Sequence, residues 1–264
     1  MASLGVGGFL VVLVLSLVFG VDLFSLLGVG SPLGSTFGTG TSGLTPPGQG
    51  AGDEEMVAFV SAVLDDSQVM WAGLFEESGI PYEEAQLVLE DGVVASACGN
   101  VPEAAGPFYC PLDETIYLNF AFYDTLRNRY GASGDFAEAY VIAHEMGHHI
   151  QNLLGTATEV RQQQQANPAQ ANRLSVALEL QADCYAGIWG STLNDPGRVQ
   201  ITQGDFEEAI AAAAAIGDDA LQEQATGRVN PESFTHGTSE QRVNWFVRGF
   251  ESGDPNACDT FAAL

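Results

Sequence analysis

Apolar residues recur three and four positions apart along much of the chain, which is the spacing of amphipathic helices. The pattern predicts one helix from Glu54 to Glu77, a second from Asn172 to Gly190 and a third from Gln241 to Phe250. An Ala-rich run that ends at Ile216 predicts a fourth. The core candidates of the first and third helices are Val57, Phe59, Val60, Val63, Leu64, Val69, Met70 and Leu74, and Trp245 and Phe246. The expected fold class is α+β and mostly helical.

β-Branched and aromatic residues predict a small sheet. Thr115–Phe120 has the composition of a short strand. Two further apolar runs, Leu87–Leu89 and Val93–Val94, flank Asp91 and Gly92. Because Asp-Gly is typical of tight turns between antiparallel strands, these runs predict a hairpin.

Composition divides the chain into three parts. Residues 2–21 are uncharged, mostly apolar and numerous enough to cross a bilayer, so we expect one transmembrane helix as an anchor within residues 1–27. Residues 28–53 are rich in Gly, Ser, Thr and Pro, which predicts a flexible linker. Residues 54–264 are sufficient for one globular domain.

A cleaved signal peptide is the alternative to a retained anchor. Such a peptide needs basic residues at its start and a small-residue cleavage site. The first basic residue is Arg127, and Val18–Gly20 matches a cleavage site poorly, so we favour the anchor. Because no Lys or Arg lies beside the apolar segment, charge does not predict its orientation.

The most specific pattern is the stretch His144–His148, which reads H-E-x-x-H. Residues four apart on a helix lie on the same face, so His144 and His148 can bind one metal ion together. Glu145, beside the first ligand, can then act as general base toward a water molecule activated by the metal. The motif predicts a zinc site with hydrolytic chemistry.

A third ligand is expected on the second predicted helix, where Glu179 and Asp183 are also four apart. We expect Glu179 to bind the metal and Asp183 to accept a hydrogen bond from the outer N–H of a ligating histidine. The alternative is a helix with two solvated acids, because the chain contains 34 acidic residues.

The motif helix is expected to run from Phe136 to Leu154. Two capping boxes are predicted, formed by Asp135 with Glu138 and, before the Ala-rich helix, by Asp205 with Glu208. Gly147 costs its helix about 1 kcal/mol relative to Ala. We therefore expect another backbone, or the substrate, to approach closely at Gly147.

Four blocks of sequence resemble a known family. The blocks are residues 134–151, Leu178–Gly187, Ile216–Asp219 and Thr235–Arg242. In this order they resemble the bacterial membrane-anchored neutral zinc metallopeptidase family, and the similarity covers most of residues 54–264. The resemblance implies a zincin-like, gluzincin-type peptidase domain with His144, His148 and Glu179 on zinc. It also implies that Glu145 is the base.

Two further histidines need separate interpretations. His149 points about 100° away from its neighbour around the helix, so we expect it to pack rather than to bind the metal. His236 lies in a predicted loop, Pro231–Gly237. Since thermolysin-like enzymes use a His and a Tyr to donate to the oxyanion, we expect His236 to take this role, with a loop-stabilising hydrogen bond as the alternative. Other candidate donors are Arg242, Tyr140 and Tyr185.

The four Cys residues contain no C-x-x-C pair, which argues against a zinc ribbon or a dithiol redox motif. Behind a membrane-crossing segment we expect two disulfides. Of the three possible connectivities we favour Cys98–Cys110 with Cys184–Cys258. The alternative is four buried thiols in a cytoplasmic protein.

The charge balance excludes one class of partner. The chain has eight Arg, no Lys and a formal net charge of −26. Such a surface repels nucleic acid, so we expect no DNA or RNA partner. The expected partners are a peptide or protein substrate and, through the anchor, the membrane.

Together these patterns predict a single-pass, membrane-tethered zinc endopeptidase with its domain outside the cytoplasm. One alternative is a non-catalytic extracytoplasmic binding or scaffold domain in which zinc is structural. A purely structural site has no need of a base such as Glu145. A second alternative is a zinc hydrolase of a non-peptide amide, such as a cell-wall component, which its reaction products would distinguish.

Overall fold

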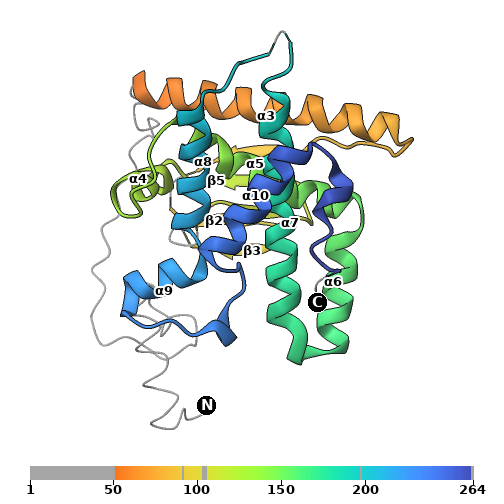
Figure 1. The fold of residues 1–264 in the computed structure, drawn as a ribbon, viewed down its shortest axis with the longest axis vertical. Coiled ribbons are helices and arrows are strands. Elements are labelled where there is room, and N and C mark those ends of the chain that lie inside the picture. The colour runs from red at the N-terminus through yellow and green to blue at the C-terminus, as the bar shows by residue number, and fades with distance from the viewer. Residues whose placement is uncertain (1–50, 91, 103–105, 197, 263–264) are drawn as a thin grey trace, which may run out of the picture. The chain divides into compact units, whose positions relative to one another are not determined.

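The structure, a computed structural model, describes residues 51–90, 92–102, 106–196 and 198–262 (Figure 1). The anchor predicted within residues 1–27, and the predicted linker up to residue 50, lie outside these ranges. None of the helices within the described ranges is both long enough and apolar enough to span a bilayer. Helices dominate and short strands complete the fold, which confirms the predicted α+β class.

Four helices form the centre of the compact unit that spans Met56–Leu264. α5 (Asp135–Leu153) packs against α7 (Ala171–Thr192), and α8 (Gln203–Ala215) and α10 (Ser239–Ser252) pack over them (Figure 1). The helices predicted for these stretches are confirmed. As predicted, Phe246 is buried, but Trp245 only packs partly buried against the core.

The first helix, α3 (Ala51–Glu77), presents its apolar face to α7. Trp71 meets the Tyr185 ring edge-on at a centroid distance of 5.2 Å, and Trp189 donates a hydrogen bond to Asp66 at 2.8 Å. The core assignment of Val69 is wrong, because this side chain is 75% exposed. Two residues from Trp71 along a helix, Val69 is rotated by about 200° and faces away from the core.

The shorter helices connect these elements. They are α4 (Phe120–Asn128), α6 (Thr156–Ala166), α9 (Asp218–Thr226) and the 3-10 turns η2 (Pro168–Gln170), η3 (Pro231–Ser233) and η4 (Pro255–Cys258). α6 and the first half of α7 form a hairpin that projects beyond the central helices (Figure 1). The 3-10 turn η3 lies within the predicted loop that carries His236.

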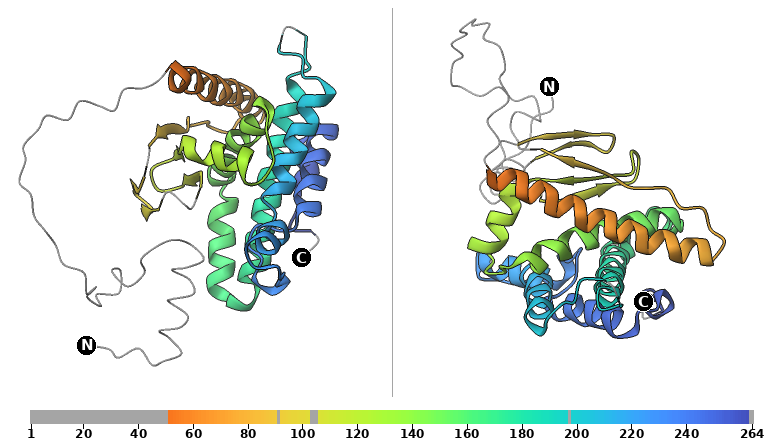
Figure 2. Two further views of the ribbon diagram at one scale, coloured as in Figure 1. Left: turned by 90° about the vertical axis from the view of Figure 1, so that its left-hand side faces the viewer. Right: turned by 90° about the horizontal axis from the view of Figure 1, so that it is seen from above.

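Five short strands form two sheets. In the first, β5 (Thr115–Leu118) lies between β1 (Gln86–Leu89), to which it is parallel, and β4 (Phe108–Cys110), to which it is antiparallel. The second is a hairpin of β2 (Val94–Ser96) and β3 (Gly99–Val101). The strands lie on one side of α5, and α8 and α10 lie on the other (Figure 2).

The predicted hairpin between Leu87–Leu89 and Val93–Val94 is wrong. β1 pairs with β5, and Val94 pairs with Val101 of β3. All four residues of β5 are buried, so pairing with this distant strand buries more apolar surface than a local hairpin would. The predicted strand from Thr115 also ends early, because the Asn119 side chain accepts a hydrogen bond from the Ala121 N–H and starts α4.

Neither predicted capping box forms. The N-cap residue of α5 is Gly134. The backbone N–H of Phe136, the second residue of the helix, donates a hydrogen bond to the Glu208 side chain at 3.1 Å. Glu138 instead forms an ion pair with Arg127 at 2.5 Å. At α5, a residue distant in sequence takes the place of the acid that the pattern predicts as the cap. At α8, a hydroxyl group takes that place. At α8 that hydroxyl belongs to Thr202, whose reciprocal partner is Asp205.

Both favoured disulfides are present. Cys98, which lies between β2 and β3, is bonded to Cys110 of β4, with Cα atoms 5.8 Å apart. Cys184 of α7 is bonded to Cys258 of η4, with Cα atoms 5.7 Å apart. The second bond fastens the C-terminal segment to the helix that carries Glu179 and Asp183.

Candidate metal centre

Three predicted ligands meet where α5 crosses α7. One ligand atom from each of His144, His148 and Glu179 lies within 4.8 Å of the other two. Nε2 of His144 is 3.2 Å from Oε2 of Glu179, and Nε2 of His148 is 3.5 Å from Oε1 of the same carboxylate. The imidazole rings stand edge to face at a centroid distance of 4.8 Å. The two four-residue spacings therefore place one ligand set on facing helices.

The two distances between the carboxylate and the imidazoles fit a tetrahedral zinc site. Ligands about 2.0–2.1 Å from a tetrahedral zinc ion lie roughly 3.3 Å from each other. The contacts of Glu179 with His144 and His148, at 3.2 and 3.5 Å, lie on either side of this value. Two imidazoles and one carboxylate are also the protein donors of a hydrolytic zinc site, in which water takes the fourth position.

The outer nitrogen of His144 is held by Asp183, as predicted. Nδ1 of His144 lies 2.8 Å from Oδ1 of Asp183, and the Asp183 side chain is fully buried. The Tyr140 hydroxyl donates to the same oxygen at 2.5 Å. Because a carboxylate only accepts hydrogen bonds, Nδ1 of His144 carries a proton, and Nε2 is the ring nitrogen that would bind a metal.

His148 is held by Gln151, which sequence reasoning missed. Nδ1 of His148 lies 2.9 Å from Oε1 of Gln151, and Nε2 of Gln151 donates to the Leu178 carbonyl at 2.6 Å. Since a carbonyl only accepts, the Gln151 amide must present its oxygen to His148, and Nε2 of His148 is left for a metal. The signal was available, because Gln151 is three residues beyond His148 on the same helix.

Burial and charge oppose each other in the triad of His144, His148 and Glu179. Burial acts to lower the pKa of His144, but Asp183 and Glu179 outweigh it and raise the pKa to about 9. Burial likewise opposes a charged His148, yet Glu179 raises the pKa of that ring above its usual value. Burial disfavours ionised Glu179, but the two rings hold the pKa of its carboxyl well below the usual range. The metal-free site is therefore built to hold positive charge beside one carboxylate.

Glu145 is placed differently from Glu179. It is 7% exposed and directly follows His144, and its carboxylate takes part in no hydrogen bond or ion pair with the part of the chain that the structure describes. Its charge acts on His148, which places the carboxylate near the triad. A nearly buried carboxylate with no protein donor is suited to accept a proton from a bound water molecule.

Gly147 permits the close crossing of the two ligand helices. A Cβ atom added there would lie 2.9 Å from both Cα and the carbonyl oxygen of Ala182, which is too close for any side chain. The expectation that another backbone approaches Gly147 is confirmed. Since Ala182 lies between Glu179 and Asp183 in sequence, this contact sets the separation of the ligands on α5 from those on α7.

His236 is fixed by Asp218, the first residue of α9. One oxygen of Asp218 accepts three backbone N–H groups, from Thr235 at 2.7 Å, His236 at 2.6 Å and Gly237 at 3.1 Å. The other oxygen lies 3.3 Å from Nδ1 of His236. The ring is half exposed, and Asp218 raises its pKa. The loop also packs against α7. A Cβ atom at Gly237 would lie 3.2 Å from the side chain of Leu180, which is next to Glu179 in sequence.

The other candidate donors are buried, and two of them form hydrogen bonds with nearby residues. Arg242 is 2% exposed and forms hydrogen bonds with Asp183, Tyr140 and the Ile216 carbonyl. The Tyr140 hydroxyl donates a hydrogen bond to Asp183. Tyr185 is buried against Trp71 of α3. Of the four donors considered, only His236 combines an exposed ring with a ring nitrogen, Nε2, that no described residue occupies.

His149 packs, as predicted, and does not join the triad. Its ring is fully buried, with Nε2 2.7 Å from the Glu83 carbonyl and Nδ1 3.0 Å from the Tyr109 hydroxyl. Burial lowers its pKa. Because Tyr109 belongs to β4, this histidine fastens a strand of the sheet to the helix that carries the ligands.

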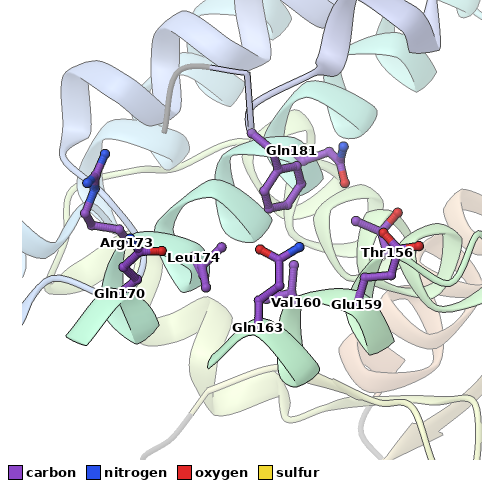
Figure 3. Close-up of a pocket in the computed structure, with 9 residues that line it drawn as sticks. Thr156, Glu159, Val160, Gln163, Gln170, Arg173, Leu174 and Gln181 are labelled. Atoms are coloured by element: carbon purple, nitrogen blue, oxygen red, sulfur yellow. The ribbon is translucent and has the colours of Figure 1, made fainter. Parts of the chain in front are cut away.

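A cavity of about 600 Å³ lies elsewhere, between α6 and α7 (Figure 3). Its walls include Gln163 and Val160 of α6, and Arg173 and Leu174 of α7. None of the triad residues lines it, so its size carries no argument about the metal centre. Gln181, which also lines the cavity, is the one link, because it accepts a hydrogen bond from Gln151 at 3.2 Å.

Comparison with known proteins agrees with this geometry. The chain is 46% identical over 260 residues to "Uncharacterized protein YpfJ" of Escherichia coli (strain K12), an alignment that covers 97% of this chain and 87% of the relative. It is 47% identical over 191 residues to "Uncharacterized protein Rv2575" of Mycobacterium tuberculosis (strain ATCC 25618 / H37Rv), covering 69% of this chain and 64% of the relative. No solved structure matches the chain. Residues 1–261 match the family described as "Putative neutral zinc metallopeptidase", and the chain belongs to this family.

Proposed function

We propose that the chain is a zinc-dependent endopeptidase whose metal is held by His144, His148 and Glu179. The observation that carries the proposal is the convergence of these three side chains, with both Nε2 atoms turned to the Glu179 carboxylate and both Nδ1 atoms held by acceptors. Membership of the neutral zinc metallopeptidase family supports the same chemistry. An intact acid at Glu145 favours a hydrolytic site over a structural one.

The proposed chemistry divides between the metal and the chain. A bound zinc ion supplies Lewis-acid chemistry, since it lowers the pKa of water towards about 7 and polarises a carbonyl group. Glu145 takes the proton of the attacking water and passes it to the leaving nitrogen. Asp183 and Gln151 hold the imidazoles in the tautomer that keeps Nε2 deprotonated.

We further propose that His236 donates a hydrogen bond to the oxyanion that forms at the scissile carbonyl. Asp218 holds Nδ1 of this ring, so Nε2 can donate when the ring is doubly protonated. The hydrogen bond to Asp218 raises the pKa of the ring, which favours this doubly protonated form. Loss of one such donor typically costs about 3–4 kcal/mol of barrier.

The domain is proposed to work outside the cytoplasm, tethered by the apolar segment at residues 2–21. The two disulfides support this location, because such bonds persist in oxidising compartments. The substrate is proposed to be a peptide or protein, in keeping with the family.

The test compares the wild-type chain, Glu145→Gln and a matched control, Glu159→Gln, which alters an exposed acid on α6. Zinc content and cleavage of casein are measured for each. We expect one zinc per chain in all three proteins, with cleavage abolished in Glu145→Gln alone. His236→Ala should keep its zinc and lose about 100- to 1,000-fold in kcat.

Other outcomes would contradict specific parts of the proposal. A wild-type chain without zinc would refute the metal centre. Zinc without cleavage of casein, but with release of fragments from cell-wall material, would replace the peptide substrate with a non-peptide amide. Full activity in Glu145→Gln would remove Glu145 as the base.

A further inference from the structure

Arg242, on the last long helix of the chain, forms a buried ion pair with the acid that orients His144. Its Nε donates to Oδ2 of Asp183 at 2.9 Å, and its Nη2 donates to Oδ1 at 2.9 Å. Arg242 is 2% exposed and Asp183 is fully buried. The pair is therefore bidentate and desolvated, which is the arrangement in which an arginine most strongly fixes a carboxylate.

The remaining donors of Arg242 tie this pair to two other elements. Nη2 also donates to the Tyr140 hydroxyl of α5 at 3.2 Å, and Nη1 donates to the Ile216 carbonyl, just beyond α8, at 3.2 Å. With both of its oxygens held by Arg242, Asp183 can turn neither towards nor away from His144. The guanidinium thus fixes the position of Asp183, and its Nη2 also lies 3.3 Å from Nδ1 of His144 itself.

Charge explains why a cation is needed at this place. Glu145, Glu179 and Asp183 are three carboxylates grouped around His144 and His148, and Arg242 forms an ion pair with one of them, Asp183. A buried carboxylate without a compensating charge is strongly disfavoured. Arg242 supplies that charge at Asp183 without occupying the atoms that face the metal.

We propose that Arg242 is a positioning residue for the metal centre, which acts through Asp183 to orient His144 and to set the affinity of the site for zinc. The inference rests on the proposed zinc site, and adds α10 to the two helices that carry the ligands. α10 is held close to α7, because a Cβ atom at Gly249 would lie 1.9 Å from the Cys184 carbonyl, one residue after Asp183. This contact fixes the distance over which Arg242 reaches the acid.

The experiment measures zinc affinity, by competition with a chelator, for the full chain carrying Arg242→Met or Arg242→Lys. Partners of metal-binding histidines typically change affinity by about 10- to 100-fold, and we expect a loss of this size in Arg242→Met. Lysine keeps the charge but cannot form the two parallel hydrogen bonds, so Arg242→Lys should recover only part of the affinity. In cobalt-substituted protein, the visible absorption bands should change in Arg242→Met, because the orientation of His144 changes.

A double variant tests the route through Asp183. If Arg242 acts through this acid, Asp183→Asn with Arg242→Met should bind zinc no more weakly than Asp183→Asn alone. The matched control is Arg127→Met, which removes another arginine paired to a buried acid of α5, Glu138. This control should lower stability and leave zinc affinity within twofold of wild type.

Three results separate the possible failures. A wild-type chain that binds no zinc would refute the proposed metal centre itself. Zinc binding by wild type that is unchanged in both Arg242 variants, with unchanged cobalt spectra, would overturn only the role of Arg242. If Arg242→Met fails to fold, Arg242→Lys decides the matter, since affinity equal to that of wild type would show that charge alone, without bidentate positioning, is sufficient.

Discussion

Gln151 fixes the orientation of His148 from within the same helix. Its Oε1 lies 2.9 Å from Nδ1 of His148, and its amide nitrogen bridges to α7 at the Leu178 carbonyl. The two histidines proposed as ligands therefore have unlike partners, a charged acid for His144 and a neutral amide for His148. This difference limits the negative charge around the site and lets each partner be tested separately.

Replacing Gln151 by Ala should weaken zinc binding about 10- to 100-fold, because His148 loses the acceptor that selects its tautomer. Dissociation constants measured by chelator competition will check this. Gln163→Ala, on the exposed face of α6, is the control and should match wild type. Equal affinities for the two variants would show that Gln151 only joins α5 to α7.

Zinc affinity should keep rising with pH up to about 9. The pKa of His144 is raised to about 9 in the metal-free site, and that of His148 is raised as well. Below these values the rings hold protons that zinc must displace, so affinity falls as pH falls. Calorimetry at pH 7.5, in buffers of different ionisation enthalpy, should show release of about one proton or more per zinc. An affinity that levels off near pH 6.5, as for unperturbed histidines, would contradict the coupling with Asp183 and Glu179.

The ligand set was predictable because its spacing is local. His144 and His148 are four apart on one helix, as are Glu179 and Asp183 on another, and helical geometry alone aligns each pair. What joins the pairs is not local. Arg242 reaches Asp183 from 59 positions away, and no periodicity in the sequence selects that partner.

The errors in the predicted fold have the same origin. β1 was expected to pair across the nearest turn signal, but a buried strand further along the chain is the better partner. Local patterns determine which element forms, and burial in three dimensions determines what it pairs with. The helices were therefore predicted well, and the strand partners and helix caps were not.

The long-range cap of α5 can be tested by two substitutions. Glu208→Ala removes the acceptor of the Phe136 N–H and should lower the free energy of unfolding by about 1 kcal/mol. Asp135→Ala removes the exposed acid that was expected to cap the helix, and should cost less than half as much. Urea denaturation of both variants gives the comparison. A larger loss of unfolding free energy for Asp135→Ala than for Glu208→Ala would show that Asp135 caps the helix.

The two disulfides should differ in their contribution to stability. Cys184 and Cys258 are 74 positions apart, and Cys98 and Cys110 are 12 apart. On the chain-entropy model, these bonds restrict the unfolded chain by about 4.5 and about 3 kcal/mol respectively. Replacing each pair by Ala and measuring unfolding free energies should preserve this order. The opposite order would mean that the β2–β3 region depends on its bond for native packing.

The crossing of α5 and α7 gives the strictest test of the site's geometry, because glycine is required there for space. Gly147→Ala places a methyl group 2.9 Å from the backbone of Ala182, and should cost about 1–3 kcal/mol. Because α7 carries Glu179, the displaced helix should also bind zinc more weakly. Gly73→Ala, on α3, is the matched control, since a Cβ there has no neighbour within 4 Å. That variant should be stabilised by about 0.5–1 kcal/mol, because alanine favours the helix. Thermal unfolding with and without zinc separates the effects: a Gly147→Ala chain that is as stable as wild type and binds zinc equally well would show that the two helices have room to move apart without loss of the site.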